Sequence, residues 1–596
     1  MTTRTKIICT IGPAVNSVEK MLELIDAGMN VARLNFSHSN HDGHREVINK
    51  LKEARDISGK PLAILLDTKG PEVRIGQLKE ETVSLKRGQK LKLKPDQCGC
   101  PEFCVPITPG SVIANIEKGM KVLFNDGHIS THVLSTSEGS VEVEVENDGD
   151  IQSRKGVNIP NAVLGLPAMT EQDIEDIKFG CQEDVDIVAA SFIRSPEHVL
   201  AIKRLLYDQG KSDILVIAKI ENTEGVQNFD GILQAADGIM IARGDMGVEL
   251  PLSDVPPLQK MMIRKCYLEG KPSVTATQML ESMMSNPRPT RAEASDVANA
   301  IYDSTSAVML SGETAAGKYP IETVRVMKQI IRAAEADFDY SIFSARHSNK
   351  VYHDVPSSVT LATVKTAYSS HAKVIFIFTS SGISARLVSR LRPEMPILAM
   401  TSRIKSYHQM AFNWGVTPVF DNEGVTSMRE AFSVLSEYAL SQGVVQYGDL
   451  VVLTAGTPFG VAGTTNMMLV ESIGDVLVRG EACRGRRVHA KVALLLSPDA
   501  RHHYEVKGCI LVIPQCDDRY LPFLKNAAGV ILQNQMDDRD SERYASVVAK
   551  TLDIPVITQA DRACSILHEG QLVTLDSEQG LVFKGIVENE NDRNVE

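Results

Sequence analysis

The feature that most constrains the fold is an alternation of short β-branched runs with longer amphipathic stretches in the N-terminal half of the chain. Eight runs have the length and composition of strands: residues 6–10, 31–35, 62–67, 185–191, 214–219, 238–243, 272–277 and 306–310. Most are continuously apolar, as expected for parallel strands buried on both faces. Amphipathic stretches between them, such as residues 18–27, 195–209 and 255–269, predict helices. The sequence therefore predicts an α/β protein with a (β/α)8 TIM barrel.

The third and fourth runs are too far apart for one helix to connect them. Short runs lie between them, at residues 83–85, 90–93, 121–124, 133–134 and 140–145, with Gly and Asp turn signals. They predict an all-β domain inserted into a loop at the C-terminal face of the barrel. Strand and helix patterns then resume twice. We assign residues 1–70 and 168–345 to the barrel, 71–167 to the inserted β-barrel domain, 346–475 to an α/β domain, and 476–596 to a fourth domain with an acidic tail at 588–596.

Composition excludes several classes of protein. The formal net charge is −12 and no basic block is present, which argues against nucleic-acid binding. No apolar run is long enough to span a membrane. The ten cysteines mostly occur singly in apolar segments, which predicts a reduced, cytoplasmic protein. Cys98, Cys100 and Cys104 could begin a zinc site, but no fourth ligand lies near them in sequence, so we favour a turn.

Polar residues follow six of the eight predicted strands. They lie at the C-terminal end of the barrel, which carries the active site in (β/α)8 barrel enzymes. The alternation of side chains along a strand places Lys219 with Glu221 on one face. The same argument pairs Arg33 with Asn35, and Arg243 with Asp245. One such pair could be a structural salt bridge, but convergence of the whole set on one mouth favours a functional site.

The residue types indicate phosphoryl transfer. Glu221 and Asp245 come from adjacent strands, and Mg²⁺ prefers one or two protein carboxylates. Arg33, Arg74 and Lys219 supply cations for developing charge, and no P-loop is present. A second, oxygen-rich set suits either a monovalent cation or a plain hydrogen-bond network, and the sequence leaves both open. It consists of Asn35, Ser37, Asp67 and Thr68.

Seven segments resemble motifs of the pyruvate kinase family and occur in the family's order. They are TIGP (10–13), NVARLNFSH (30–38), LDTKGPEVR (66–74), IAKIEN (217–222), ARGDMG (242–247), TATQMLESM (275–283) and SGETA (311–315). The likeness covers about residues 1–475. It implies an enzyme that transfers the phosphoryl group of phosphoenolpyruvate to ADP, giving pyruvate and ATP in the last step of glycolysis, and it implies a homotetramer.

The resemblance also implies roles for individual residues. Glu221 and Asp245 would hold Mg²⁺ or Mn²⁺, Lys219 would stabilise the phosphoryl group in flight, and Thr277 would assist protonation of enolpyruvate. The implied catalytic residues are Lys219, Arg33 and Thr277; the substrate-binding residues are Arg33, Lys219, Gly244, Asp245 and Thr277; the nucleotide-binding residues are Arg74, His38, Lys155 and Asn35. Lys155 belongs to the inserted domain, which closes over the site as a lid in this family and excludes water.

Potassium is the second implied cofactor, bound by Asn35, Ser37, Asp67 and Thr68. Members of the family with glutamate at the position of Glu72 depend on K⁺, whereas members with lysine do not. Ile75 departs from the pattern, because dependent members usually carry threonine there. We predict K⁺ dependence from Glu72.

The α/β domain resembles the family's effector domain. A Gly/Ser loop precedes a helix, and helix N-termini favour anions, so we predict a phosphorylated effector here over a plain helix cap. The predicted effector residues are Thr379, Ser380, Ser381, Gly382 and Ser384. The family's usual cation after the glycine is replaced by Ile383, which leaves the identity of the effector open.

The fourth domain resembles the swivelling phosphohistidine domain of phosphoenolpyruvate-utilising enzymes. Tyr544 stands at the position of the histidine, so the domain should not carry phosphoryl groups, and we expect a packing or regulatory role. Three other functions are less consistent with the sequence. The presence of Lys219, Glu221 and Asp245 argues against a non-catalytic paralogue, the inserted domain argues against a lyase, and Tyr544 argues against a phosphohistidine dikinase.

Overall fold

The structure is a computed structural model, and it describes residues 3–95, 104–137, 139–347, 352–422, 424–457, 463–483, 485–499 and 503–587. The chain divides into two compact units. The first comprises residues 1–364, 377–425 and 455–466, and the second comprises residues 365–376, 426–454 and 467–596.

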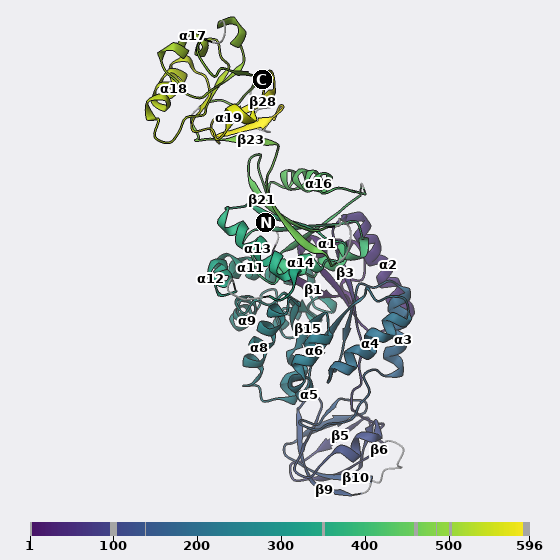
Figure 1. The fold of residues 1–596 in the computed structure, drawn as a ribbon. Coiled ribbons are helices and arrows are strands. Elements are labelled where there is room, and N and C mark those ends of the chain that lie inside the picture. The colour runs from purple at the N-terminus through teal and green to yellow at the C-terminus, as the bar shows by residue number, and fades with distance from the viewer. Residues whose placement is uncertain are drawn as a thin grey trace. The chain divides into compact units, whose positions relative to one another are not determined.

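Eight parallel strands close into a barrel in the order β1-β17-β16-β15-β14-β13-β3-β2 (Figure 1). They are β1 (Lys6–Thr10), β2 (Val31–Asn35), β3 (Ala63–Asp67), β13 (Ile187–Ala190), β14 (Leu215–Ile220), β15 (Gly238–Ala242), β16 (Ser273–Ala276) and β17 (Ala307–Leu310). Neighbouring residues of one strand enter different cores: Ile8 packs inside the barrel, and Ile7 packs against the outer helices. This explains the continuously apolar runs, and the predicted barrel is confirmed.

Helices surround the barrel. They are α1 (Val18–Ala27), α2 (His41–Ser58), α3 (Glu171–Gln182), α4 (Pro196–Asp208), α5 (Thr223–Gln227), α6 (Phe229–Ala235), α7 (Arg243–Glu249), α8 (Val255–Leu268), α9 (Arg291–Tyr302), α10 (Gly312–Ala315), α11 (Pro320–Asp337) and α12 (Tyr340–His347). Capping boxes fix the first turns of α3, through Thr170 and Asp173, and of α9, through Thr290 and Glu293.

The start of α7 corrects one prediction. We expected Arg243 and Asp245 to share a face of an extended strand, but β15 ends at Ala242 and α7 begins at Arg243. Arg243 instead pairs with Asp296, 2.7 Å away, and donates to the Thr277 carbonyl oxygen at 2.8 Å. The two-residue alternation does not apply once the chain turns into a helix.

The segment between β3 and α3 forms a seven-stranded sheet in the order β12-β8-β9-β10-β6-β7-β4 and a two-stranded sheet of β11 and β5. The strands are β4 (Arg74–Ile75), β5 (Thr82–Leu85), β6 (Lys90–Pro95), β7 (Cys104–Thr108), β8 (Lys121–Phe124), β9 (Ile129–Ser137), β10 (Ser140–Val145), β11 (Gly149–Gln152) and β12 (Val157–Asn158). A separate apolar core stabilises them. Four of these strands, β4, β7, β11 and β12, were not predicted, because three of them are very short or polar and β7 contains Pro106.

The next sheet has five strands in the order β20-β19-β18-β21-β22. Its strands are β18 (Val374–Phe378), β19 (Ile397–Thr401), β20 (Val416–Phe420), β21 (Leu450–Gly456) and β22 (Thr465–Ser472), and its helices are α13 (Val355–Ser369), α14 (Ile383–Ser389), α15 (Ile404–Met410) and α16 (Met428–Ser441). Strand β22 was not predicted, because its side chains are exposed or only partly buried after Thr465 and lack an apolar alternation.

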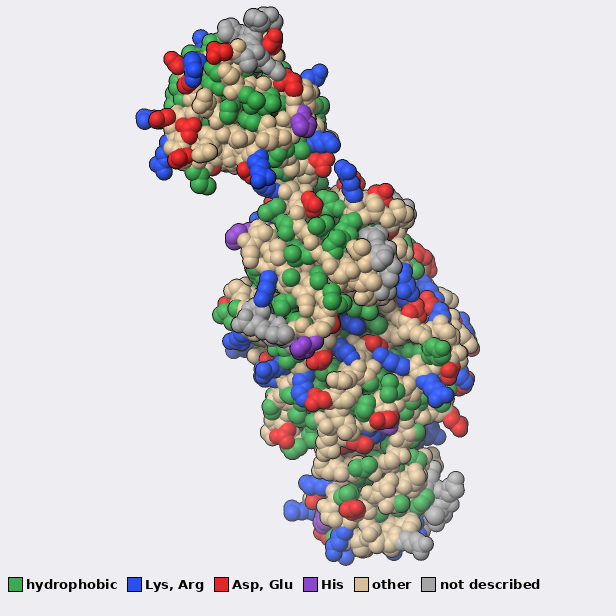
Figure 2. Space-filling model, in the orientation of Figure 1, with side chains coloured by type: hydrophobic (Ala, Val, Ile, Leu, Met, Phe, Trp, Pro, Cys, Tyr) green, Lys and Arg blue, Asp and Glu red, His purple; other side chains and the backbone are tan. Residues whose placement is uncertain are grey.

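The C-terminal sheet has seven strands in the order β23-β29-β28-β24-β25-β26-β27. These are β23 (Val476–Arg479), β24 (Val488–Leu494), β25 (Ile510–Ile513), β26 (Gly529–Leu532), β27 (Val556–Ile557), β28 (Leu572–Asp576) and β29 (Leu581–Lys584), with helices α17 (Leu521–Leu524), α18 (Arg539–Leu552) and α19 (Ala563–Ile566). No helix in the described part of the chain is both long and apolar enough to cross a bilayer. Figure 2 shows acidic and basic side chains interspersed on the visible face.

Candidate active site

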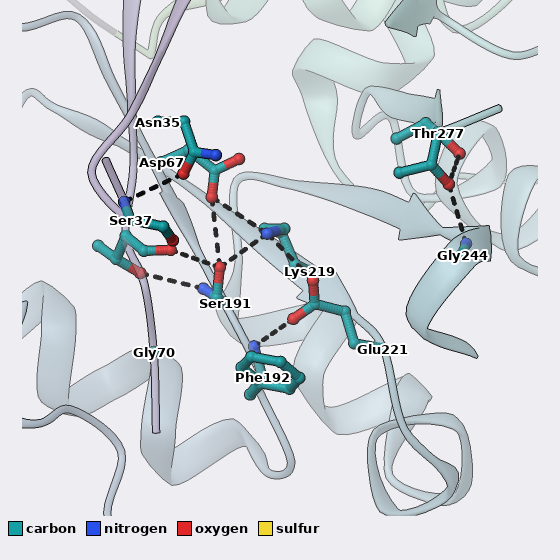
Figure 3. A network of polar contacts seen from close by, with 12 residues as sticks. Asn35, Ser37, Asp67, Gly70, Ser191, Phe192, Lys219, Glu221, Gly244 and Thr277 are labelled. Carbon is teal, nitrogen blue, oxygen red and sulfur yellow. Dashed lines mark hydrogen bonds and ion pairs between the residues drawn. The ribbon is translucent and has the colours of Figure 1, made fainter. Parts of the chain in front are cut away.

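Lys219, at the end of β14, is the centre of a buried polar network at the carboxyl ends of the barrel strands (Figure 3). Its Nζ atom lies 3.1 Å from Asp67 Oδ1, 3.0 Å from Glu221 Oε1 and 2.7 Å from Ser191 Oγ. Lys219 is 9% exposed, and both carboxylates are 1% exposed. Burial opposes the charged ammonium, but Asp67 and Glu221 raise the pKa of Lys219 above its ordinary value. The lysine is therefore a fixed, buried positive charge.

Asp67 connects Lys219 to Arg33. Arg33 Nε donates to Asp67 Oδ2 at 2.6 Å, and Arg33 Nη1 donates to Thr10 Oγ1 at 2.9 Å. Burial alone would raise the pKa of Asp67, but Arg33 and Lys219 together lower it below its usual value. The register of the parallel strands pairs Asn35 with Asp67, which places the ends of β2 and β3 side by side. The predicted convergence of these strand ends is thus observed.

Ser191, directly after β13, belongs to this network and was missed. Besides accepting from Lys219, its hydroxyl donates to the Thr68 carbonyl oxygen at 2.6 Å. Gly70 packs against it with φ of 76°, and a Cβ atom at Gly70 would lie 2.8 Å from the Ser191 Cβ. The sequence did contain a signal for Ser191: it is a polar residue at the end of the fourth predicted strand, and polar residues at the ends of other strands were assigned to the site.

Glu221 and Asp245 contribute acidic groups on neighbouring elements. The Glu221 Oε2 atom accepts from the Phe192 backbone N–H at 2.5 Å. Asp245 lies on α7, in contact with solvent at the wall of a cavity of ≈ 200 Å³. Loss of hydration there, followed by repulsion from Glu221, raises the pKa of Asp245 to about 7. Asp245 lines the cavity, whereas Glu221 is buried and is not among the lining residues. Two carboxylates that repel each other have the donor set and charge that a divalent cation would satisfy.

The cavity lies between the inserted strands and the barrel end. Its charged lining residues are Glu72, Arg74, Asp126, Arg194, Glu224, Asp245 and Glu249. Asp126, Arg194, Glu224 and Glu249 were missed, because they lie in turns or on short helices rather than at the strand ends that the alternation of side chains identifies. Arg194 donates to the Phe192 and Pro71 carbonyl oxygens, at 3.0 and 3.3 Å.

Thr277, the residue after β16, has a strained backbone. Its φ is 66°, which is rare for a β-branched residue. The Thr277 hydroxyl accepts from the Gly244 N–H at 2.9 Å and donates to the Ala276 carbonyl at 2.7 Å (Figure 3). Strain of this kind is found where the surrounding structure fixes a functional side chain.

The residues predicted to face the nucleotide are spread more widely. Arg74 lines the cavity and donates through Nε to Glu72 Oε2 at 2.6 Å. Lys155 is exposed in the loop between β11 and β12, and its carbonyl oxygen accepts from the Ile75 N–H at 2.8 Å. His38 is exposed after β2. The structure thus places Arg74 at the cavity, whereas Lys155 and His38 are not among its lining residues.

The oxygen-rich set meets at the ends of β2 and β3. Asn35 Oδ1 accepts from the Ser37 N–H at 3.1 Å, and Thr68 Oγ1 accepts from the Ser191 N–H at 3.1 Å. Both Asp67 oxygens already contact cationic side chains. These amide, hydroxyl and carboxylate oxygens have the chemistry of a monovalent-cation site, and they also form a hydrogen-bond network.

The predicted effector residues form the loop before α14. Gly382 has φ of 79°, and its N–H donates to Thr379 Oγ1 at 3.0 Å. Ser380 and Ser381 complete the turn, and the Ser380 carbonyl oxygen accepts from Ser406 Oγ at 2.8 Å. The Ser384 hydroxyl is hydrogen-bonded to the buried Thr465 hydroxyl. Ser384 thus already has a protein partner.

Three remaining predictions concern other parts of the chain. Cys98 and Cys100, with the acidic tail, lie outside the described residues. In the part of the chain that the structure describes, no group of three or more His, Cys, Asp or Glu side chains is placed to hold a metal ion. Tyr544 is half-buried on α18.

Comparisons with known proteins cover nearly the whole chain. Residues 2–324 match the family described as "Pyruvate kinase, barrel domain", residues 357–471 match "Pyruvate kinase, alpha/beta domain", and residues 505–580 match "PEP-utilising enzyme, mobile domain". The pyruvate kinase of Geobacillus stearothermophilus is 41% identical over 590 residues, which are 98% of this chain and 99% of the relative. The pyruvate kinases of Sporosarcina psychrophila and Bacillus licheniformis are each 40% identical, with the same coverage.

Proposed function

The chain belongs to the pyruvate kinase family, and we propose that it transfers the phosphoryl group of phosphoenolpyruvate to ADP, giving pyruvate and ATP. The observation that carries this proposal is the buried ammonium of Lys219, held between two carboxylates at the mouth of the barrel. Phosphoryl transfer requires little covalent chemistry from the protein. It depends on positioning and on fixed positive charge beside the oxygens that carry charge in the transition state.

Lys219 and Arg33 would supply that charge. Asp67 contacts both side chains and keeps them in place while no substrate is bound. Because Lys219 stays protonated, it can stabilise the phosphoryl group as it leaves enolpyruvate and moves in line to the ADP β-phosphate. The inserted domain, residues 71–167, would close over the cavity and exclude water, which would otherwise accept the phosphoryl group.

Glu221 and Asp245 would hold Mg²⁺ or Mn²⁺. The repulsion that raises the pKa of Asp245 is relieved when a cation binds, so the donor set fits this role. The bound ion would neutralise negative charge on the phosphate and carboxylate oxygens. We assign K⁺ to the oxygens of Asn35, Ser37, Asp67 and Thr68, consistent with the chemistry of that set.

Thr277 and Gly244 would position the substrate carboxylate and assist protonation at carbon. The Thr277 hydroxyl already orients the Gly244 N–H at 2.9 Å, so the two residues act as one unit. Arg74, with His38, Lys155 and Asn35, would contact the nucleotide. We further propose a cytoplasmic homotetramer in the last step of glycolysis, with a phosphorylated effector at residues 379–384.

The test is a coupled assay for pyruvate with phosphoenolpyruvate and ADP, in which Mg²⁺ and K⁺ are omitted in turn. We expect turnover only when both ions are present. Turnover without K⁺ would contradict the potassium assignment and leave the kinase intact. A folded protein without turnover, with both ions and with sugar phosphates or nucleotides added, would contradict the proposed function and favour a non-catalytic paralogue.

A further inference from the structure

A second cluster of charged side chains lies at the opposite end of the barrel, where the strands begin. Four cations, Lys271, Arg386, Arg390 and Arg392, line one small cavity. Lys271 lies two residues before β16, whereas the arginines belong to α14 and the turn that follows it. Ser306, before β17, and Trp414 also line the cavity. All of these residues belong to the first compact unit.

None of the four cations has a carboxylate partner. Among the described residues, no Asp or Glu oxygen lies within 4.0 Å of their nitrogens. Lys271 Nζ donates to the carbonyl oxygens of Leu233, Gln234 and Ala236, each at 2.7 Å. Arg392 Nη2 donates at 2.9 Å to the Ser304 carbonyl oxygen and to Ser306 Oγ. The cations therefore have only neutral hydrogen-bond partners.

Several arginine donors have no partner at all. They are Arg386 Nε, Arg390 Nε and Nη2, and Arg392 Nε. Arg390 is 8% exposed and Arg392 is 2% exposed. Their guanidinium groups lie over the Tyr352 and Trp414 rings, at 4.2 and 4.4 Å from the ring centres. Aromatic faces attract cations but cannot accept these N–H groups in the planes of the guanidinium groups.

We propose that this cavity binds a single monatomic anion of the chloride class. Buried N–H donors without partners and buried cations without carboxylates both cost free energy, and a bound negative charge would reduce that cost. Burial lowers the pKa of Arg392 to about 9, a cost that an adjacent anion would offset.

The size of the cavity selects the anion. Its volume of ≈ 10 Å³ is that of one water-sized guest. A space of this size favours a monatomic anion over a tetrahedral oxyanion such as phosphate or sulfate, or an organic carboxylate, whose other atoms would have to extend toward solvent. The bound anion would link α14 and its following turn to the start of β16 and β17. The site is separate from the phosphoryl-transfer network, so the proposal does not depend on the proposed function.

Thermal unfolding tests the proposal. The full-length protein is heated in potassium gluconate, and chloride replaces gluconate stepwise at constant potassium concentration and ionic strength. We expect a saturable rise in Tm of about 2–4 °C. A linear or absent response would contradict the proposal.

Two variants locate the effect. Arg390→Met removes two of the unpartnered donors and should abolish the chloride response. Arg264→Met, at an exposed position on α8, is the matched control and should retain the response. A chloride response that persists in Arg390→Met would overturn the assignment to this cavity.

A direct measurement covers the case in which Arg390→Met does not fold. Crystals of the wild-type protein soaked in bromide should show an anomalous peak among the three arginine side chains. No peak there, with peaks at other surface sites, would overturn the proposal. A water or a carboxylate group in the cavity would do the same.

Discussion

The two ends of the barrel bury cations in opposite ways. At the carboxyl ends of the strands, Lys219 and Arg33 share the carboxylate of Asp67, and Lys219 also contacts Glu221. At the amino ends, Arg390 and Arg392 contact one carbonyl oxygen, one hydroxyl and two aromatic rings, but no carboxylate within 4.0 Å among the described residues.

The difference indicates what each end is built to accept. At the mouth, the protein fixes its own opposite charges, so that the cations stay charged and aligned before a highly charged substrate arrives. At the base, the positive charge is left without protein counter-charge, which suits a small anion that stays bound. Removing one cation at each end should therefore have different consequences.

The largest expected effect concerns Lys219. Lys219→Met removes the ammonium and keeps the length of the side chain, so kcat should fall by about 10³-fold or more. The coupled pyruvate assay measures it. Lys178→Met is the matched control, since Lys178 forms only an exposed pair with Glu175 and its loss should leave kcat unchanged. Equal activity of both variants would contradict the role of Lys219.

The next effect compares stability at the two ends. Arg33→Met leaves the buried Asp67 without its closest cation, so the free energy of unfolding should fall by about 3–5 kcal/mol. Arg390→Met, in gluconate buffer, leaves no buried carboxylate behind and removes a contact with Tyr352, so its cost should be about 1 kcal/mol or less. Denaturant titration measures both. Equal losses of unfolding free energy in the two variants would refute the contrast between the two ends of the barrel.

A pH effect should appear at the base through His408. Burial, and then Arg55, lower its pKa to about 3, and its Nδ1 atom accepts from the Leu62 N–H at 3.3 Å. The unfolded chain binds a proton below about pH 6.5 and the folded chain does not, so stability falls as the pH drops from about 6.5 toward 3. The loss should reach about 2 kcal/mol at pH 5. His408→Gln should remove this part of the slope, and an unchanged slope would contradict the assignment.

The smallest expected effect concerns Ser191. Ser191→Ala removes one hydrogen bond to Lys219 and leaves both carboxylate contacts, so kcat should fall by about 3–10-fold. Because the hydroxyl positions the lysine, KM should change less than kcat. A change confined to KM would show that Ser191 acts on substrate binding instead.

Sequence alone predicted most of the barrel, because its strands are buried on both faces and read as continuous apolar runs. It also placed Lys219 and Glu221 on one face, since the chain is extended up to Ile220. The same alternation failed for Arg243 and Asp245, where the chain turns into α7 one residue earlier than expected.

Contacts between distant segments could not be predicted in this way. The pairing of Arg33 with Asp67 depends on the register of two strands. The cavity residues Asp126 and Glu249 meet only when the inserted strands fold against the barrel end. The cationic cavity gathers residues from α14 and from the loop before β16, and no local pattern marks it.

The most direct test of the central claim follows the phosphorus atom itself. Wild-type protein and Lys219→Met are incubated with phosphoenolpyruvate, ADP, Mg²⁺ and K⁺, and ³¹P NMR records the products. We expect the phosphoenolpyruvate signal of the wild type to be replaced by the γ-phosphate of ATP, without inorganic phosphate, while the variant leaves the phosphoenolpyruvate signal nearly unchanged. Release of inorganic phosphate by the wild type, or ATP formation by the variant at the wild-type rate, would contradict the central claim.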